Sequence, residues 1–148
     1  MYQRALQGFE KALSPDHTST LDTRALQGFE KALGPDHTST LDTVNNLAAL
    51  YADQGKLVEA EQMYQRALQG FEKALGPDHT STLTTVHNLG NIYKNRGKLI
   101  EAEQMYQRAL QGCEKALSPN HTSTLDTVNN LGFLYSDQGK LVEAEQMY

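Results

Sequence analysis

Cysteine is nearly absent from this sequence, since Cys113 is the only one among 148 residues. A single cysteine excludes an internal disulfide framework and suits a reducing compartment. No run of about 18 apolar residues is present, so we expect no membrane span. The N-terminus, MYQRALQGFE, lacks the apolar core of a signal peptide. These absences predict a cytoplasmic protein.

Clusters of basic residues are also absent. The 13 basic and 18 acidic residues give a formal net charge of −5, and no basic run or stripe interrupts the chain. Nucleic acid and anionic membranes are therefore not expected partners. No Ser-His-Asp, paired-acid, phosphate-loop, CxxC or HExxH pattern stands out, so we expect neither an enzyme nor a bound cofactor.

An internal repeat dominates what the sequence does contain. The segment RALQGFEKALGPDHTSTL begins at Arg24 and at Arg66, and a close copy begins at Arg108. The period is 42 residues (66 − 24 and 108 − 66), and residues 24–65 differ from residues 66–107 at only nine positions. Such self-similarity is typical of a solenoid.

Each repeat predicts two helices. Ser39 and Asp42 resemble a capping box, which puts the start of the first helix near Thr38. A second helix is expected from about Lys56 to Leu75, after a stop at Gly55. The inward apolar positions at helical spacing are Leu41, Val44, Leu47, Ala48 and Tyr51 in the first helix, and Leu57, Ala60, Tyr64, Ala67, Leu68, Phe71, Ala74 and Leu75 in the second.

Two antiparallel helices cannot bury both of their faces alone, whereas stacked copies can. The expected fold is therefore all-α, a right-handed α-solenoid of stacked antiparallel helix pairs. The chain forms one array over residues 1–148. Its expected units are truncated and fused first repeats at 1–37, full repeats at 38–79 and 80–121, and a C-terminal partial repeat at 122–148.

The start of the array is shortened. Copies of RALQGFEKAL begin at Arg4 and Arg24, only 20 residues apart, so 22 residues (42 − 20) are missing after Thr23. We interpret this as a deletion without a function of its own. The surviving ends are expected to fuse into one helix from about Thr18 to Leu33. An apolar stripe continues through the joint at Leu21, Ala25, Phe29 and Ala32.

Several conspicuous residues have structural interpretations. Cys113 stands where the preceding repeat has Phe71, so we expect a buried thiol rather than a nucleophile. Gly8, Gly28, Gly70 and Gly112 recur inside second helices, which predicts close helix packing. Histidines also recur with the repeat, too far apart to share a metal ion, and are expected in loops just before helices. They are His17, His37, His79 and His121.

One set of repeated residues resembles the tetratricopeptide repeat signature. It comprises Val44, Leu47, Ala48, Tyr51, Gly55, Ala60, Tyr64 and Ala67, then Val86, Leu89, Gly90, Tyr93, Ala102, Tyr106 and Ala109, and Val128, Leu131, Gly132, Tyr135 and Ala144. The 42-residue period, against the usual 34, resembles the long variant of kinesin light chains and of fungal nucleotide-binding immune-type receptors. The resemblance implies a scaffold that holds proteins or extended peptides in a concave groove lined by the first helices.

The repeats differ from one another mainly on one face of the first helix. At about 100° per residue, Asn45, Ala49, Ala52 and Asp53 fall with Asp42 within an arc of roughly 100°. The apolar residues occupy the opposite side. The solvent face of the second helix hardly varies, so we interpret the variation as ligand recognition rather than drift.

The resemblance places this variable arc in the ligand groove, and it implies that Asn46, Asn88 and Asn130 bond the backbone of an extended ligand. A carboxamide can donate and accept at once, as a peptide bond requires. The candidate ligand-binding residues are Asn45, Asn46, Ala49, Ala52, Asp53, His87, Asn88, Asn91, Lys94, Asn95, Asn129, Asn130, Phe133, Ser136 and Asp137.

Two roles remain open at this point. The first is the ligand-sensing or interaction region of a larger intracellular protein. The alternative is a structural module that assembles through its repeat ends, either end to end or by segment exchange. Apolar residues expected to be uncovered at the two ends are Tyr2, Leu6 and Phe9, and Leu141, Ala144 and Tyr148.

Overall fold

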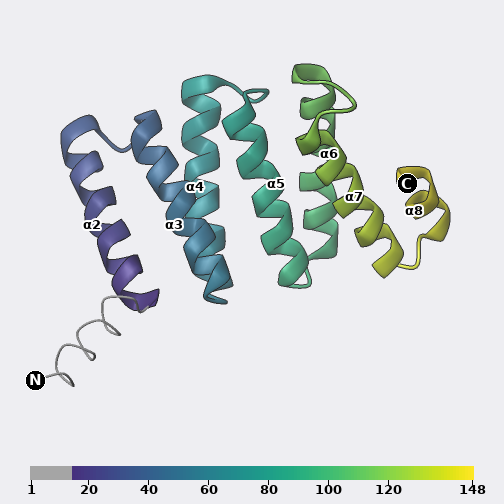
Figure 1. Cartoon of the computed structure of the whole chain (residues 1–148), viewed down its shortest axis with the longest axis horizontal. Coiled ribbons are helices and arrows are strands. Elements are labelled where there is room, and N and C mark those ends of the chain that lie inside the picture. The colour runs from purple at the N-terminus through teal and green to yellow at the C-terminus, as the bar shows by residue number, and fades with distance from the viewer. Residues whose placement is uncertain (1–14) are drawn as a thin grey trace, which may run out of the picture.

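The structure is a computed structural model that describes residues 15–148, with side chains from residue 21 onward. This part of the chain contains helices and no strand, which confirms the all-α repeat fold. The helices lie side by side in chain order along the long axis of the molecule (Figure 1). They are α2 (Pro15–Leu33), α3 (Thr38–Asp53), α4 (Leu57–Leu75), α5 (Thr80–Asn95), α6 (Leu99–Ala116), α7 (Thr122–Asp137) and α8 (Leu141–Met147).

Each helix packs against the next one in the chain. Residues 38–79 contain α3 and α4, residues 80–121 contain α5 and α6, and residues 122–148 contain α7 and α8. In addition, α4 packs on α5 and α6 packs on α7, so each of these second helices is held between two first helices. The repeats therefore share one continuous core, as a solenoid requires.

The apolar positions expected in the repeat at 38–79 form most of this core. Leu41, Val44, Leu47 and Ala48 of α3 are buried, and Ala60, Tyr64, Ala67 and Phe71 of α4 are buried with them. Burying one large apolar side chain contributes about 1.5–3 kcal/mol. Ala74 was wrongly expected inside, because it lies at the edge of the apolar stripe in the last turn and is exposed.

Histidines begin the first helices. His37, His79 and His121 are the N-caps of α3, α5 and α7, and in each the ring Nδ1 accepts a hydrogen bond of 3.2 Å from the backbone N–H two residues later. The start at Thr38 is confirmed. The capping box is not, because the backbone N–H of Ser39 uses the histidine and Ser39 itself lies inside the helix.

One histidine departs from the expected loop position. His17 lies within α2, because this helix begins at Pro15 rather than near Thr18. The fixed φ of proline suits the first turn of a helix, and its missing N–H costs nothing there. The fusion of the two truncated repeats into one helix ending at Leu33 is confirmed.

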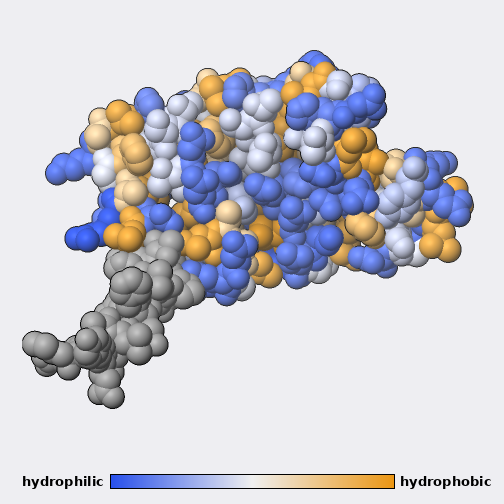
Figure 2. Space-filling view, viewed as in Figure 1, coloured by the Kyte–Doolittle hydropathy of each residue, from blue (hydrophilic) through white to orange (hydrophobic). Residues whose placement is uncertain are grey.

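The apolar stripe of α2 faces solvent in the part of the chain that the structure describes. Leu21 and Phe29 are 49% and 39% exposed, and Ala25 and Ala32 are exposed as well, whereas Leu26 is buried against α3. The missing 22 residues include most of the helix that covers the corresponding face of α4. Figure 2 shows apolar surface at the α2 end of the molecule and again near α8.

Two glycines sit where neighbouring helices come closest. A Cβ atom on Gly70 would lie 2.4 Å from Leu41 Cδ2, and one on Gly112 would lie 2.2 Å from Leu83 Cδ2. A side chain at either position would require the leucine to shift, which confirms the close packing expected there. Gly28 has no described atom within 4 Å of its Cβ position, because the counterpart of Leu41 is Leu21, which lies within α2 itself rather than on a facing helix. Gly8 lies outside the described residues.

Polar contacts between second helices recur with the repeat. The ion pairs Arg66–Glu30 and Arg108–Glu72 join successive second helices. Lys140 Nζ likewise lies 3.0 Å from a carboxylate oxygen of Glu103. Each of these partly exposed ion pairs contributes little stability, but their spacing along the chain matches the repeat.

No helix within residues 15–148 is long and apolar enough to cross a membrane.

Candidate functional site: the groove of the first helices

Hydrogen bonds join the first helices of successive repeats directly. Oγ1 of Thr85 on α5 lies 3.1 Å from Oδ1 of Asn45 on α3. One repeat later, His87 Nδ1 lies 3.0 Å from Thr127 Oγ1, and Asn130 Nδ2 lies 3.1 Å from His87 Nε2. The helices α3, α5 and α7 therefore form one surface. Cavities of about 190 Å³ between α3 and α5, and about 370 Å³ between α5 and α7, hollow this surface.

Every candidate ligand-binding residue is accessible on this surface. The exposed ones are Asn46, Ala49, Asp53, Asn95, Asn129, Phe133, Ser136 and Asp137. The half-buried ones are Asn45, Ala52, His87, Asn88, Asn91, Lys94 and Asn130. Three of these, Asn45, His87 and Asn130, also join neighbouring helices, so they combine a structural role with their place in the groove.

A fourth candidate contacts the core. The hydroxyl of Tyr106 donates a 2.5 Å hydrogen bond to Asn91 Oδ1. Burial raises the pKa of Tyr106 to about 12, so the hydroxyl keeps its proton at neutral pH and remains a donor. The preceding repeat has Tyr64 and Ala49 at these two positions, and burial, with a smaller effect of the Asp53 carboxylate, also raises the pKa of Tyr64 to about 12.

The hydrogen-bond partners of His87 determine which of its two ring nitrogens carries the proton. The Thr127 hydroxyl already donates to the Ser123 carbonyl over 2.9 Å, so it accepts from His87 Nδ1–H. His87 Nε2 then accepts from the Asn130 amide. The ring also lies 5.6 Å from that of Tyr106, centroid to centroid. Burial lowers the pKa of His87 below its ordinary 6.5, and the carboxylate of Asp126 opposes this in part.

This lowered pKa makes the fold sensitive to mild acid. Below about pH 6.5 the unfolded chain binds a proton at His87 that the folded chain does not yet bind. The free energy of unfolding should therefore fall as the pH drops below about 6.5. Urea unfolding measured at pH 7.5 and 5.5 checks this. Between these pH values the His87→Asn variant, which has the residue found at Asn45 and Asn129, should lose less free energy of unfolding than the wild type. Equal losses for both proteins would contradict this assignment.

Comparisons with known proteins identify the repeats. The tetratricopeptide repeat model matches residues 20–73, 39–96 and 81–148. The chain belongs to this family. No curated protein matches the chain.

Solved structures of other tetratricopeptide arrays share the fold. BtubC (BKLC) from P. vanneervenii is 24% identical, with a TM-score of 0.79 over 90% of this chain and 53% of its own length. A putative kinesin light chain from Podosopora anserina with nearly identical TPR-like repeats is 23% identical, with a TM-score of 0.82 over 97% of this chain and 68% of its own. A point variant of the latter protein has a TM-score of 0.83, with the same sequence identity and the same coverage. This chain thus spans about half to two thirds of these proteins.

The family assignment sets the general role. Tetratricopeptide repeats mediate protein–protein interactions. The resemblance to the long, kinesin light chain-like repeat is confirmed.

Sequence comparison between the repeats missed two features of this tetratricopeptide groove. Thr85 and Thr127 join the first helices but do not vary, so a search for variable positions passes over them. The exchange of Phe71 for Cys113 was visible but was interpreted only as a change of packing. Cys113 is indeed buried, and burial raises the pKa of its thiol, but it also lines the larger cavity.

Proposed function

We propose that this chain binds an extended peptide along α3, α5 and α7, as the interaction or ligand-sensing region of a larger intracellular protein. One observation carries the proposal. The core and the second helices are nearly the same in every repeat, whereas the differences concentrate on the accessible face of the first helices. A surface that only had to stay solvated would vary equally on the second helices.

The chemistry of this face suits a peptide. Asn46 is exposed and Asn88 half-buried at equivalent places on α3 and α5, where each amide could pair with a backbone N–H and C=O. Lys94 stands on the central helix, and Asp53 and Asp137 stand on the helices to either side. The groove therefore offers an alternating charge pattern that can set the register of a ligand.

A display library of extended peptides tests this proposal. The matched variant carries His87→Asn, Asn91→Ala, Lys94→Ala and Asn95→Asp, which makes this face of α5 copy α3. It should fold, because every introduced residue occurs at the same place one repeat earlier. Peptides selected on the wild type should bind this variant at least about tenfold more weakly. Equal affinity, or no enriched peptide, would argue against a peptide groove.

Self-assembly through the ends is a second candidate. Of the end residues expected to be uncovered, Ala144 is buried, and Tyr2, Leu6 and Phe9 lie outside the described residues. Both ends of the described structure nevertheless expose apolar side chains, among them Leu21 and Phe29 on α2, and Leu141 and Tyr148 at the other end, which are 64% and 70% exposed. Both sets belong to the repeating interface between helix pairs, so a head-to-tail contact between copies would cover them. Sedimentation over a wide concentration range should then show association. A monomer at millimolar concentration would exclude it.

A further inference from the structure

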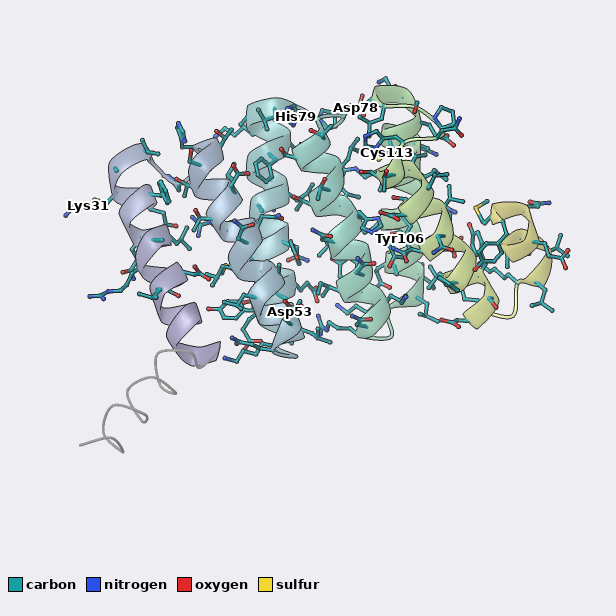
Figure 3. All side chains as sticks on the ribbon, in the orientation of Figure 1. Lys31, Asp53, Asp78, His79, Tyr106 and Cys113 are labelled. Carbon is teal, nitrogen blue, oxygen red and sulfur yellow. The ribbon has the colours of Figure 1, made fainter. Side chains whose placement is uncertain are left out.

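The larger of the two cavities lies between α5 and α7, above the side chain of Cys113. Its volume is about 370 Å³, within the range of small-ligand sites. Figure 3 shows Cys113 near the same long edge of the array as Asp78 and His79, at the top of the view, with Tyr106 lower down. We call this cavity the Cys113 pocket. Its lining residues are Thr80, Leu83, Thr84, His87, Asn88, Cys113, Leu117, His121, Ser123, Asp126 and Thr127.

The preceding repeat has a smaller cavity at the same place. Of the six residues that line it, five have counterparts 42 residues later that line the Cys113 pocket. The cavity there measures only about 190 Å³. At its floor stands Phe71, where the larger pocket has Cys113, so the larger pocket opens where a phenyl ring has been lost.

The walls of the pocket keep the neighbours of that lost ring. Phe71 is 1% exposed and packs in one apolar cluster with Leu41 and Leu75. The counterparts of these two leucines are Leu83 and Leu117, and both line the Cys113 pocket. The protein itself therefore shows which side chain suits these walls, because an aromatic ring fills the same surroundings one repeat earlier.

The pocket mouth carries a single carboxylate. Asp126 is exposed and lines the pocket, whereas the equivalent position in the smaller cavity is the neutral Thr84. Within the described part of the chain, no lysine or arginine lines the pocket. Two histidines also line the pocket. The ring of His87 is occupied at both nitrogens by Thr127 and Asn130, and His121 Nδ1 accepts a hydrogen bond from the backbone N–H of Ser123. A cation at the mouth would meet Asp126 without an opposing positive charge among the lining residues.

From these observations we infer that the Cys113 pocket binds an aromatic side chain of the peptide ligand, with a neighbouring lysine or arginine of that ligand paired to Asp126. The inference rests on the proposed peptide groove and names its anchor. Leu83, Cys113 and Leu117 supply apolar contacts within the pocket, and apolar cavities of smaller volume bind a benzene ring. Aromatic anchors in such pockets carry much of the energy of an interface.

Replacing Cys113 with phenylalanine closes the pocket. The side chain should fit, because Phe71 fits the same surroundings. Since His87 is larger than its counterpart Asn45, the double variant C113F/H87N also gives the new phenyl ring the smaller neighbour that Phe71 has. Cys113→Ala keeps the pocket open and serves as the matched control.

Two probes report on the pocket. A peptide display library on the wild-type chain should enrich an aromatic residue next to a basic one. Peptides so enriched should bind C113F and C113F/H87N at least about tenfold more weakly, and C113A with little change. Asp126→Asn should remove the preference for the basic residue and keep that for the aromatic one. Benzylamine, which combines a phenyl ring with a cation, should shift NMR signals of residues around Cys113 in the wild type but not in C113F.

The possible outcomes distinguish a failure of the pocket proposal from a failure of the peptide-groove proposal. Enriched peptides without an aromatic residue, or ones that bind C113F as tightly as the wild type, would overturn the pocket assignment and leave the groove standing. If no peptide is enriched but benzylamine shifts signals at the pocket only in the wild type, the pocket binds its ligand class and the peptide groove fails. If neither probe binds, both proposals fail.

Discussion

Replacing Gly70 with alanine should destabilise the solenoid by about 1–3 kcal/mol, whereas the same change at Gly28 should stabilise it by about 1 kcal/mol. Both glycines occupy the same position in a second helix, and each is followed by a phenylalanine. Intrinsic helix propensity favours alanine equally at the two sites. Only the surroundings differ between them.

At Gly70 the new methyl group would meet a wall that cannot move aside freely. It would lie 2.4 and 2.7 Å from the two methyl carbons of Leu41 and 3.1 Å from Leu41 Cγ. Leu41 is 1% exposed and packs in a cluster with Leu26 and Phe71. Shifting it would disturb the contact between α3 and its neighbours, and that strain outweighs the gain in propensity.

At Gly28 the same methyl group would enter solvent, because no described atom lies within 4 Å of its position. Its backbone is helical and has no positive φ. Urea unfolding of the two single variants gives the comparison. Equal shifts of the midpoint in the same direction would show that close packing at Gly70 does not constrain the fold.

The repeat made the fold predictable from the sequence. Near-identical copies give the same helical stripe three times, so the inward positions around Val44 and Tyr64 could be identified without coordinates. The helix starts could not be explained in the same way. A histidine cap depends on the orientation of the His37 ring toward the N–H of Ser39, and the sequence pattern offered the capping box as an equally good account.

The candidate site was predictable as a face but not as a set of contacts. Helical geometry placed the variable residues on one accessible surface. It could not show that His87 reaches across to Thr127 and Asn130, because those residues are 40 and 43 positions away. The Cys113 pocket was hidden for a related reason, since a cavity depends on the space that several helices leave together.

Simultaneous replacement of Lys94 and Phe133 by alanine should weaken the binding of a selected peptide by about 30-fold, close to 2 kcal/mol. Lys94 is half-buried on α5, and Phe133 on α7 is 49% exposed. In the proposed groove the ammonium group meets an acidic or polar group of the ligand, and the phenyl ring meets an apolar one. Isothermal titration with peptides from the display selection measures the effect.

Stability must be followed in the same variant, because the Phe133 ring also packs edge-on against Tyr148, with 6.0 Å between the ring centres. Losing that contact costs up to about 1.5 kcal/mol, which should lower the melting temperature without unfolding the array. A control with Val58→Ala and Lys73→Ala removes the same kinds of group from α4, where Val58 is 50% exposed, and it should leave affinity unchanged. If the groove variant bound the peptide as tightly as this control, Lys94 and Phe133 would lie outside the ligand site. The ligand would then have to contact another part of the first-helix surface.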